Sequence, residues 1–441
     1  MAQSISSTPL EHDARTVNSG GDHHVRPGEI AIGVIIGRTS EFFDFFVYAI
    51  ASVLVFPATI FPYVDRLTGT LYSFVIFALA FVARPIGSLI FLAIDRKFGR
   101  GAKLTIALFL LGGSTVSIAF LPTYGEIGAL AALLLCGFRI GQGVALGGAW
   151  DGLASLLAMN VPDEKRGWYA MIPQIGAPLG LIVASGLFAF FLVSLSPADF
   201  LDWGWRYPFF VAFALNVVAL FARLRIVVTP DYADAFASLE LQPSRVTATI
   251  KSDGWQIVIG AFAPLASFAL FHMVTVFPLS WVALFTTEDA ARFLTTEMVG
   301  AVICICAIVA SGYAADRFGR RTVLGVSAAA IAVYSGFAPQ LLGVGEIGVA
   351  TFMIVGFVLL GLSFGQSSGA VASGFSHESR YTGSALTSDL AWLFGAGFAP
   401  LAALLLAAKL GLIAAGLYLL SGAIATLVAL GVNKNLAQRS H

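Results

Sequence analysis

Charged residues are scarce in this sequence. Only 11% of its 441 residues are Asp, Glu, Lys or Arg, whereas 58% are hydrophobic. A soluble protein of ordinary composition carries about 25% charged residues. A core cannot absorb so much apolar surface, so the composition excludes an ordinary soluble protein and predicts a chain that lies in a lipid bilayer.

Cysteine is also rare, and motifs of enzymes are missing. The three cysteines lie in apolar runs, and Cys304 and Cys306 point to different faces of a helix, which argues against a disulfide or a metal pair. The chain has no phosphate-binding loop, metal-ligand cluster or Ser/His/Asp arrangement outside the apolar runs. We therefore expect no enzymatic activity, cofactor, metal or nucleic-acid partner. Without a nucleotide-binding domain, any transport would take its energy from an ion gradient.

Long apolar runs fill most of the chain. Runs of roughly 20 residues, the length that crosses a bilayer, recur from residue 30 to residue 432. They predict an all-α integral membrane protein with twelve transmembrane helices. The predicted spans are 30–56, 70–94, 103–122, 128–157, 167–194, 205–222, 255–284, 297–315, 322–342, 347–375, 383–407 and 411–432.

The basic residues are unevenly distributed between the two sides of these spans. With the N-terminus inside, eighteen of the 25 Lys and Arg residues fall in cytoplasmic segments and four in outer segments. This asymmetry predicts that both termini are cytoplasmic. Segment 1–29 has no short apolar run with a cleavage site, so we expect a tail rather than a signal peptide. The expected location is the plasma membrane, the inner membrane of a bacterium.

One charged block occurs twice. Asp95–Arg100 has the sequence Asp-Arg-Lys-Phe-Gly-Arg, and Asp316–Arg321, 221 residues later, has the sequence Asp-Arg-Phe-Gly-Arg-Arg. Each block lies between two apolar runs, which indicates a duplicated bundle. A glycine turn with one carboxylate and several cations could link helices at the cytoplasmic surface in one state and release them in another. The candidate gating residues are Asp95, Arg96, Gly99, Arg100, Gly312, Asp316, Arg317, Gly319, Arg320 and Arg321.

The longest break in the hydrophobic pattern divides the chain into halves. It contains Pro230, Pro243 and mixed charges. We expect a tail, a six-helix bundle, a cytoplasmic linker, a second, pseudo-symmetric six-helix bundle and a short tail. Their predicted limits are 1–29, 30–222, 223–254, 255–432 and 433–441.

The first span carries three ionisable residues. Arg38, Glu41 and Asp44 are spaced i, i+3, i+6 and so form one stripe on a helix face. A cation between two carboxylates could keep one acid ionised and leave the other able to accept a proton, which is the chemistry of a proton-coupled carrier. Alternatively, Arg38 and Glu41 only neutralise each other. Arg38 is also a candidate for binding a substrate carboxylate.

The fourth span carries Arg139 and Asp151. They are twelve residues apart, about 18 Å along a helix, so they cannot pair with each other. Arg139 has Ser363 as its counterpart in the second half, which favours a functional role: organising a carboxylate of the first span or attracting an anionic substrate. Gln142 and Trp150 join Arg139 and Asp151 as candidate substrate-binding residues.

Two more charges lie inside predicted spans. Asp389, near the start of span eleven, could be a second protonation site, a substrate contact or a residue reached by cytoplasmic water. Arg84, which precedes Pro85 in span two, could pair with Asp44 or Glu41 or brace helices together.

Several motifs carry a family resemblance. Two six-helix halves, each with a loop in which Asp-Arg is followed after one or two residues by Gly-Arg, resemble the major facilitator superfamily, and finer matches resemble its metabolite:proton symporter branch. Departures from that branch include Phe91 and Arg38, which stand where glycine and asparagine are usual. The matching segments are Glu41–Phe45, Arg84–Gly87, Arg139–Gly143 with Gly147 and Gly148, Asp202–Arg206 and Arg380–Gly383.

The resemblance implies a secondary transporter that works by alternating access. We expect it to import a small carboxylate or zwitterionic metabolite together with a proton, and to function as a monomer in the bilayer. The alternatives are a proton-coupled antiporter that exports a small organic compound, and a sensor of the same fold that does not transport. A channel is disfavoured because the sequence has no ring of like charges and no pore loop.

Overall fold

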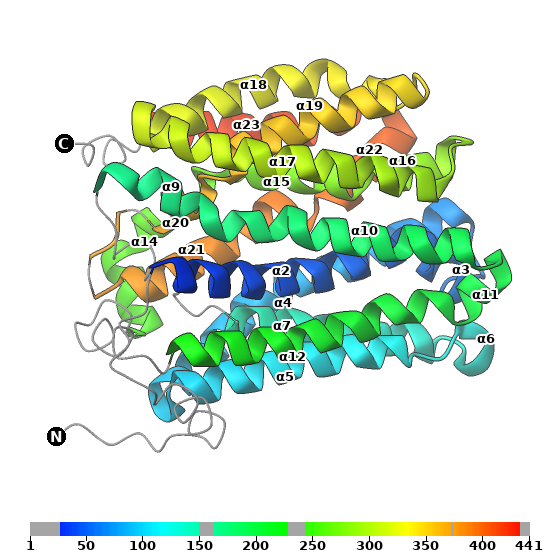
Figure 1. Cartoon of the computed structure of the whole chain (residues 1–441), viewed down its shortest axis with the longest axis horizontal. Helices are drawn as coiled ribbons and strands as arrows, with labels where there is room; N and C mark the ends of the chain where they lie inside the picture. The colour runs from blue at the N-terminus through cyan, green and yellow to red at the C-terminus, as the bar shows by residue number, and fades with distance from the viewer. Residues whose placement is uncertain (1–26, 150–162, 228–242, 373, 377, 433–441) are drawn as a thin grey trace.

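The computed structural model is a bundle of long helices that lie side by side (Figure 1). It describes residues 27–149, 163–227, 243–372, 374–376 and 378–432. The first half contains α2 (Pro27–Leu54), α3 (Phe56–Thr59), α4 (Arg66–Phe98), α5 (Arg100–Ala119), α6 (Tyr124–Ile127), α7 (Leu130–Gly148), η1 (Asp163–Lys165), α9 (Arg166–Met171), η2 (Ile172–Ile175), α10 (Gly176–Ser194), α11 (Pro197–Asp202), η3 (Gly204–Arg206) and α12 (Tyr207–Val227). The second half contains α14 (Val246–Phe262), α15 (Leu265–Thr275), α16 (Phe277–Phe285), α17 (Ala290–Phe318), α18 (Arg320–Leu341), α19 (Glu346–Phe364), α20 (Ser367–Ala372), α21 (Arg380–Ala391), η4 (Trp392–Gly397), α22 (Ala399–Leu410) and α23 (Leu412–Val432).

Twelve spans divide into two six-helix halves, as predicted. Among the residues that the structure describes, eleven helical segments are long and apolar enough to cross a membrane. The twelfth span is α2, a 28-residue helix whose apolar character is interrupted by Arg38, Glu41 and Asp44. The structure places helix ends inside the predicted linker 223–254, because α12 continues to Val227 and α14 begins at Val246.

The two halves meet along two interfaces that the repeat relates to each other. In one, α9 and α10 of the first half pack against α17 of the second half, and in the other α4 packs against α21, η4 and α22. We call them the α10–α17 interface and the α4–α22 interface. Further contacts join α2 and α16. The remaining close packing is mostly within each half, for example α4 with α7 and α18 with α23.

Both repeated loops turn on a glycine in the left-handed region. Gly99 ends α4 with a φ of 82°, and Gly319 ends α17 with a φ of 84°. Side chains disfavour this conformation, so glycine allows one long helix to end and the next to begin at once. Both turns lie at the same end of the bundle, here called the loop end; α3, α6 and α11 lie at the opposite end (Figure 1).

Two spans are interrupted close to the centre of the bundle. The seventh span breaks at Val276, just before Pro278, where α15 gives way to α16. The eleventh span widens into the π-helical segment η4 between α21 and α22. Such wide turns often occur at functional sites, and this one places Trp392 among the side chains described below.

Glycines let α4 and α7 approach each other at backbone distance. A Cβ atom at Gly143 would clash with the backbone of Ala80, and one at Gly87 would clash with the backbone of Val144. Small residues permit this close packing of membrane helices, which strengthens their van der Waals contact. By contrast, the Cβ position of Gly137 on the same helix α7 has no described atom of another helix within 4 Å, and Gly137 is exposed.

We expect Gly143→Ala to destabilise the purified protein by about 1–3 kcal/mol, the usual cost of overpacking a tight contact. The matched control is Gly137→Ala, which should be neutral or stabilise the helix by up to about 1 kcal/mol. Thermal unfolding in detergent should therefore give a lower midpoint for Gly143→Ala only. Equal midpoints for the two variants would contradict the close packing of α4 on α7.

Candidate functional site

Aromatic side chains from both halves meet in the middle of the bundle. Phe45 of α2 stacks on His272 of α15 with 4.9 Å between ring centroids, and Phe81 of α4 stacks on Trp392 of η4 at 6.3 Å. These rings are buried, so the two halves are in close contact around the centre. We call the set the aromatic cluster, and its members are Phe42, Phe45, Phe46, Phe77, Phe81, Phe268, Phe271, His272, Phe364 and Trp392.

A small apolar cavity lies beside the aromatic cluster, where α2, α10, α15, α17 and α19 meet. Its lining includes Phe46, Leu181, Phe271, Cys304 and Phe364. Because residues of both halves line it, the cavity would change shape whenever the halves move relative to each other.

His272 is the polar member of the aromatic cluster. The side chain is fully buried, and Nδ1 lies 3.4 Å from Thr275 Oγ1. Nε2 has no hydrogen-bond partner among the described residues. Buried polar atoms are rarely left unpaired, so this nitrogen is available to a ligand at the centre.

The donors that contact Asp44 within the described part of the chain are all uncharged. The Asp44 side chain is 2% exposed. Thr115 Oγ1 and Asn216 Nδ2 donate to Oδ2 at 2.6 and 2.8 Å, and Gln142 Nε2 donates to Oδ1 at 3.0 Å. Ser40 Oγ in turn donates to Asn216 Oδ1 at 2.7 Å and so orients that amide. None of the ion pairs among the described residues includes Asp44.

Arg139 is connected to Asp44 through the side chain of Gln142. It is 1% exposed, and its Nη1 donates to Gln142 Oε1 at 3.1 Å while Nε donates to the Phe77 carbonyl at 3.2 Å. The guanidinium lies 4.0 Å from the centroid of the Tyr48 ring, a cation–π contact. Nη2 has no hydrogen-bond partner among the described residues. Gln142 thus bridges the cation and the carboxylate, which do not pair directly.

Glu41 contacts two cations. Arg38 Nη1 lies 2.8 Å from Oε2, and Arg223 Nη2 lies 2.5 Å from Oε1. Arg223 also donates to the carbonyl of Ala149 at 3.1 Å. The sequence analysis placed Arg223 in the linker, but it is buried on α12. With two cationic partners, Glu41 is fully compensated as a carboxylate.

Asp389 and Arg84 join the two halves. Arg84 Nε lies 2.8 Å from Asp389 Oδ1, and Arg84 Nη2 lies 3.4 Å from Ser388 Oγ. Ser88 Oγ donates to Asp389 Oδ2. Since Ser88 also lies 3.3 Å from the Gly147 carbonyl, its single hydroxyl proton has two competing acceptors. Arg84 therefore pairs across the α4–α22 interface rather than with a carboxylate of α2.

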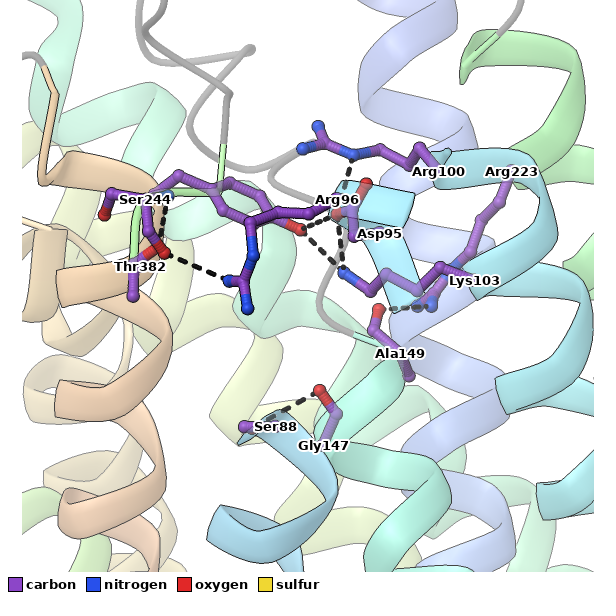
Figure 2. A network of polar contacts seen from close by, with 11 residues as sticks. Ser88, Asp95, Arg96, Arg100, Lys103, Gly147, Ala149, Arg223, Ser244 and Thr382 are labelled. Atoms are coloured by element: carbon purple, nitrogen blue, oxygen red, sulfur yellow. Dashed lines mark hydrogen bonds and ion pairs between the residues drawn. The ribbon is translucent and has the colours of Figure 1, made fainter. Parts of the chain in front are cut away.

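The first repeated loop contacts α21 of the other half (Figure 2). Lys103 Nζ lies 3.5 Å from Asp95 Oδ2 and donates to Tyr381 Oη at 2.7 Å. Arg100 Nε lies 3.4 Å from the same Asp95 oxygen, and its guanidinium lies 4.4 Å from the Tyr381 ring centroid. The predicted gating residues Asp95 and Arg100 thus lie in a buried charged network that reaches across the α4–α22 interface.

Arg96 connects the same loop to the segment before α14 (Figure 2). Its Nη1 donates to the carbonyl of Ser244 at 3.3 Å, and the Ser244 backbone N–H donates to Thr382 Oγ1 at 3.0 Å. Ser244 therefore lies between the end of α4 and the start of α21.

The second repeated loop contacts α9 of the first half. Asp316 Oδ1 accepts from the backbone N–H of Gly167 at 2.6 Å, and Trp168 N–H lies 3.2 Å from Oδ2. These amides begin a helix, where a carboxylate is favourable. Arg320 Nη1 donates to the Gly369 carbonyl at 3.1 Å. This loop therefore links α17 and α9 across the α10–α17 interface.

Two other cations of the second loop lie at its surface. Arg317 is exposed, with its guanidinium 5.3 Å from the Phe318 ring centroid, and Arg321 is half-buried in the first turn of α18.

Gly312 and Phe91 hold corresponding positions in the two halves but have different neighbours. A Cβ atom at Gly312 would lie 3.0 Å from Met171 Cγ and 3.2 Å from Trp168 Cα, so glycine lets α17 approach α9. The Phe91 ring instead packs against Gly148 of α7, within its own half. The two copies of the repeat therefore differ at this position: glycine permits contact between the halves in the second copy, whereas phenylalanine packs within its own half in the first.

Two candidate residues, Trp150 and Asp151, lie outside the described residues.

The sequence did not reveal several side chains that hold the candidate residues in place. Asn216 and Thr115 had a detectable signal, because each is a polar residue inside a predicted span. The missed residues are Ser88, Lys103, Thr115, Asn216, Arg223 and Tyr381.

Comparisons with known proteins agree with this architecture. The sugar (and other) transporter family matches residues 30–251. The inner membrane metabolite transport protein YhjE of Escherichia coli K12 is 37% identical over 413 residues, covering 91% of this chain and 93% of that protein. The proline/betaine transporter of the same organism is 27% identical and covers 92% of this chain and 83% of its own length.

A solved structure supports the fold independently. The crystal structure of a D-xylose-proton symporter superposes with a TM-score of 0.69 at 18% identity, covering 93% of this chain and 98% of that one. Together with the identity to metabolite transporters, this confirms the predictions of a two-half bundle and of a transporter rather than an enzyme. The chain belongs to the sugar (and other) transporter family of the major facilitator superfamily and is a membrane transporter, like the metabolite transport protein that it matches.

Proposed function

We propose that this transporter imports a small carboxylate or zwitterionic metabolite together with a proton. The observation that carries the proposal is Asp44, a fully buried carboxyl group with three neutral hydrogen-bond donors, one of which, Gln142, connects it to the cation Arg139. An ionised carboxylate at this depth costs free energy unless a cation compensates it. In our proposal, Asp44 is protonated in this closed state and pairs with Arg139 after it releases the proton.

The proposed substrate site is the apolar cavity and the adjoining aromatic cluster. Rings would enclose the apolar or cationic part of a metabolite. His272 Nε2 and Arg139 Nη2, which have no hydrogen-bond partner in the described part of the chain, would receive its polar groups. The name of the proline/betaine transporter is consistent with a small zwitterion.

The proposed transport cycle depends on breaking and remaking contacts between the halves. With the loop end assigned to the cytoplasm from the distribution of basic residues, the pair Arg84–Asp389 and the contacts of Asp316 would close the cytoplasmic side. Opening toward the cytoplasm would separate them, so that substrate and proton leave together.

A screen is needed first to supply a substrate. The purified protein should be tested by thermal shift against organic acids, amino acids, betaines and sugars, and a compound that stabilises it can then be used in liposomes. Uptake of that compound with alkalinisation of the medium would support symport. Symport into liposomes is driven by a medium that is more acidic than the interior. Uptake that instead requires a more alkaline medium would contradict symport.

We expect Asp44→Asn to reduce the rate of pH-driven uptake at least about tenfold. This corresponds to an increase of about 1.4 kcal/mol in the activation free energy of uptake. The amide keeps the shape of the protonated acid but carries no exchangeable charge, so exchange of labelled for unlabelled substrate should persist. The control is Asp65→Asn, which replaces an exposed carboxylate that caps α4. Normal pH-driven uptake by Asp44→Asn would refute the proton-coupling role.

We expect Asp389→Asn to open the loop end more often, because Arg84 loses its charged partner. A cysteine at position 367 can report this, since Ser367 is buried and accepts from Gln174 across the halves at 3.2 Å. A loss of about 1.5 kcal/mol, typical of a hydrogen bond to a charged group, predicts roughly tenfold faster alkylation of that cysteine.

The alkylation test uses a chain in which Cys136, Cys304 and Cys306 are replaced by alanine. Glu126→Gln serves as the control, because this exposed carboxylate caps a short helix at the opposite end. Unchanged alkylation in Asp389→Asn would mean that the Arg84–Asp389 pair does not hold the loop end closed.

A further inference from the structure

Glu297 is a buried carboxyl group that the proposed cycle does not yet use. It lies on α17, seven residues from the start of the helix and so roughly 10 Å from the end opposite the repeated loops. The side chain is 0% exposed. Ser185 Oγ of α10, which runs beside α17, donates to Oε2 at 2.8 Å. Oε1 has no hydrogen-bond partner among the described residues.

No charge compensates Glu297 within the described part of the chain. Helices α10 and α16, which pack against α17, contain no ionisable residue, and none of the ion pairs between described residues includes Glu297. Arg292 of the same helix pairs with Glu346 of α19 at the exposed end. It precedes Glu297 by five residues, which places it about 140° around the helix.

The other titratable groups on the helices around α17 lie elsewhere. Tyr334 of α18 donates to the Phe352 carbonyl at 2.8 Å. Cys304 of α17 lines the apolar cavity. Those on or next to the loop end are Arg166 and Tyr169 of α9, Arg320 and Arg321 of α18, and Tyr313, Asp316 and Arg317 of α17, while Cys306 of α17 is exposed on the outside of the bundle.

Glu297 lies between the apolar cavity and the end opposite the loops. Leu181 and Cys304 line the cavity. Ser185 follows Leu181 by four residues on α10, and Glu297 precedes Cys304 by seven on α17, so each pair shares a helix face. The Glu297–Ser185 contact therefore closes the interface on the side through which, in the proposed cycle, substrate enters.

We propose that Glu297 is a second proton-binding site, which must be protonated for the α10–α17 interface to close at the end opposite the loops. A bare carboxylate with one hydroxyl donor and no cation would cost several kcal/mol at this depth. The neutral acid carries its proton on Oε1 or Oε2 and avoids that cost. When the halves separate at this end, water solvates Glu297 and it ionises.

This proposal rests on the proposed function for its orientation, with the end opposite the loops facing outside. A proton taken from the outside would then favour closure behind the substrate, independently of the proton on Asp44. By linkage, the ratio of closed to open interface should fall by up to about tenfold per pH unit while the exposed acid is ionised and the buried one is not.

Distances between spin labels at Ser194→Cys and Thr295→Cys test this proposal without any substrate. Both positions are exposed, one at the end of α10 and one in the first turns of α17. The chain, with its three native cysteines replaced by alanine, is placed in lipid nanodiscs and measured from roughly pH 5 to pH 9, where buried carboxyl groups titrate. We expect a longer distance to gain population as the pH rises.

Variants assign this response to Glu297. Glu297→Gln should keep the short distance at every pH, whereas Glu297→Asp should retain the response because it still titrates. Glu346→Gln, which removes an exposed carboxylate at the same end, should behave like the parent chain. A pH-independent distance in the parent, or an unchanged response in Glu297→Gln, would overturn the proposal.

The Asp44→Asn variant separates this proposal from the proposed function. If Glu297 controls closure, the distance response should persist in Asp44→Asn. A response that disappears in Asp44→Asn but persists in Glu297→Gln would overturn the role of Glu297 and leave proton coupling at Asp44 intact. Conversely, pH-driven uptake by Asp44→Asn would refute the proposed function without changing the result for Glu297.

Discussion

A charged side chain inside a membrane bundle needs an opposite charge or hydrogen-bonding groups next to it in every conformation of the protein. The buried carboxyl groups of this chain differ in how they meet this requirement. Among the described residues, Glu41 contacts two arginines, Asp389 contacts one arginine and one serine, and Asp44 contacts only neutral donors. Glu297 has a single hydroxyl. Carboxyl groups with cationic partners can remain ionised while the helices around them move little. Those without cations are stable in the closed state only when they carry a proton, so they are suited to couple proton binding to movement.

The duplication gives the two interfaces the same framework but different chemistry. At the loop end, the α4–α22 interface is closed by charged side chains, Asp95 and Lys103 with Tyr381. The α10–α17 interface is closed there by Asp316, which accepts from backbone amides. The first kind of contact depends on ionic side chains that reach across the gap, and the second depends on how closely the two backbones approach. The two interfaces can therefore differ in how readily they separate, although the repeat relates them.

Much of the fold could be predicted from the sequence, because apolar run length and the distribution of basic residues are local properties. The turns at Gly99 and Gly319 could be predicted because glycine adopts positive φ angles more readily than other residues. Partners across helices could not be predicted in the same way: Arg84 and Asp389 are 305 residues apart in the chain. Arg223 was assigned to the linker because its helix continues past the apolar run. Glu297 lies at the first position of a predicted span, where a carboxylate is expected to reach water, and only the packing of α10 shows that it is buried.

The glycine-mediated contact of α4 with α7 has a mechanical consequence. Helices that touch backbone to backbone have little freedom to slide or rotate separately, so we expect α4 and α7 to move as one rigid body. Helix α7 carries Arg139 and Gln142, next to Asp44. Helix α4 carries Arg84, which pairs with Asp389 of the opposite half. A small tilt caused by a changed partner of Arg139 would thus be transmitted to the Arg84–Asp389 pair without any intervening flexible segment.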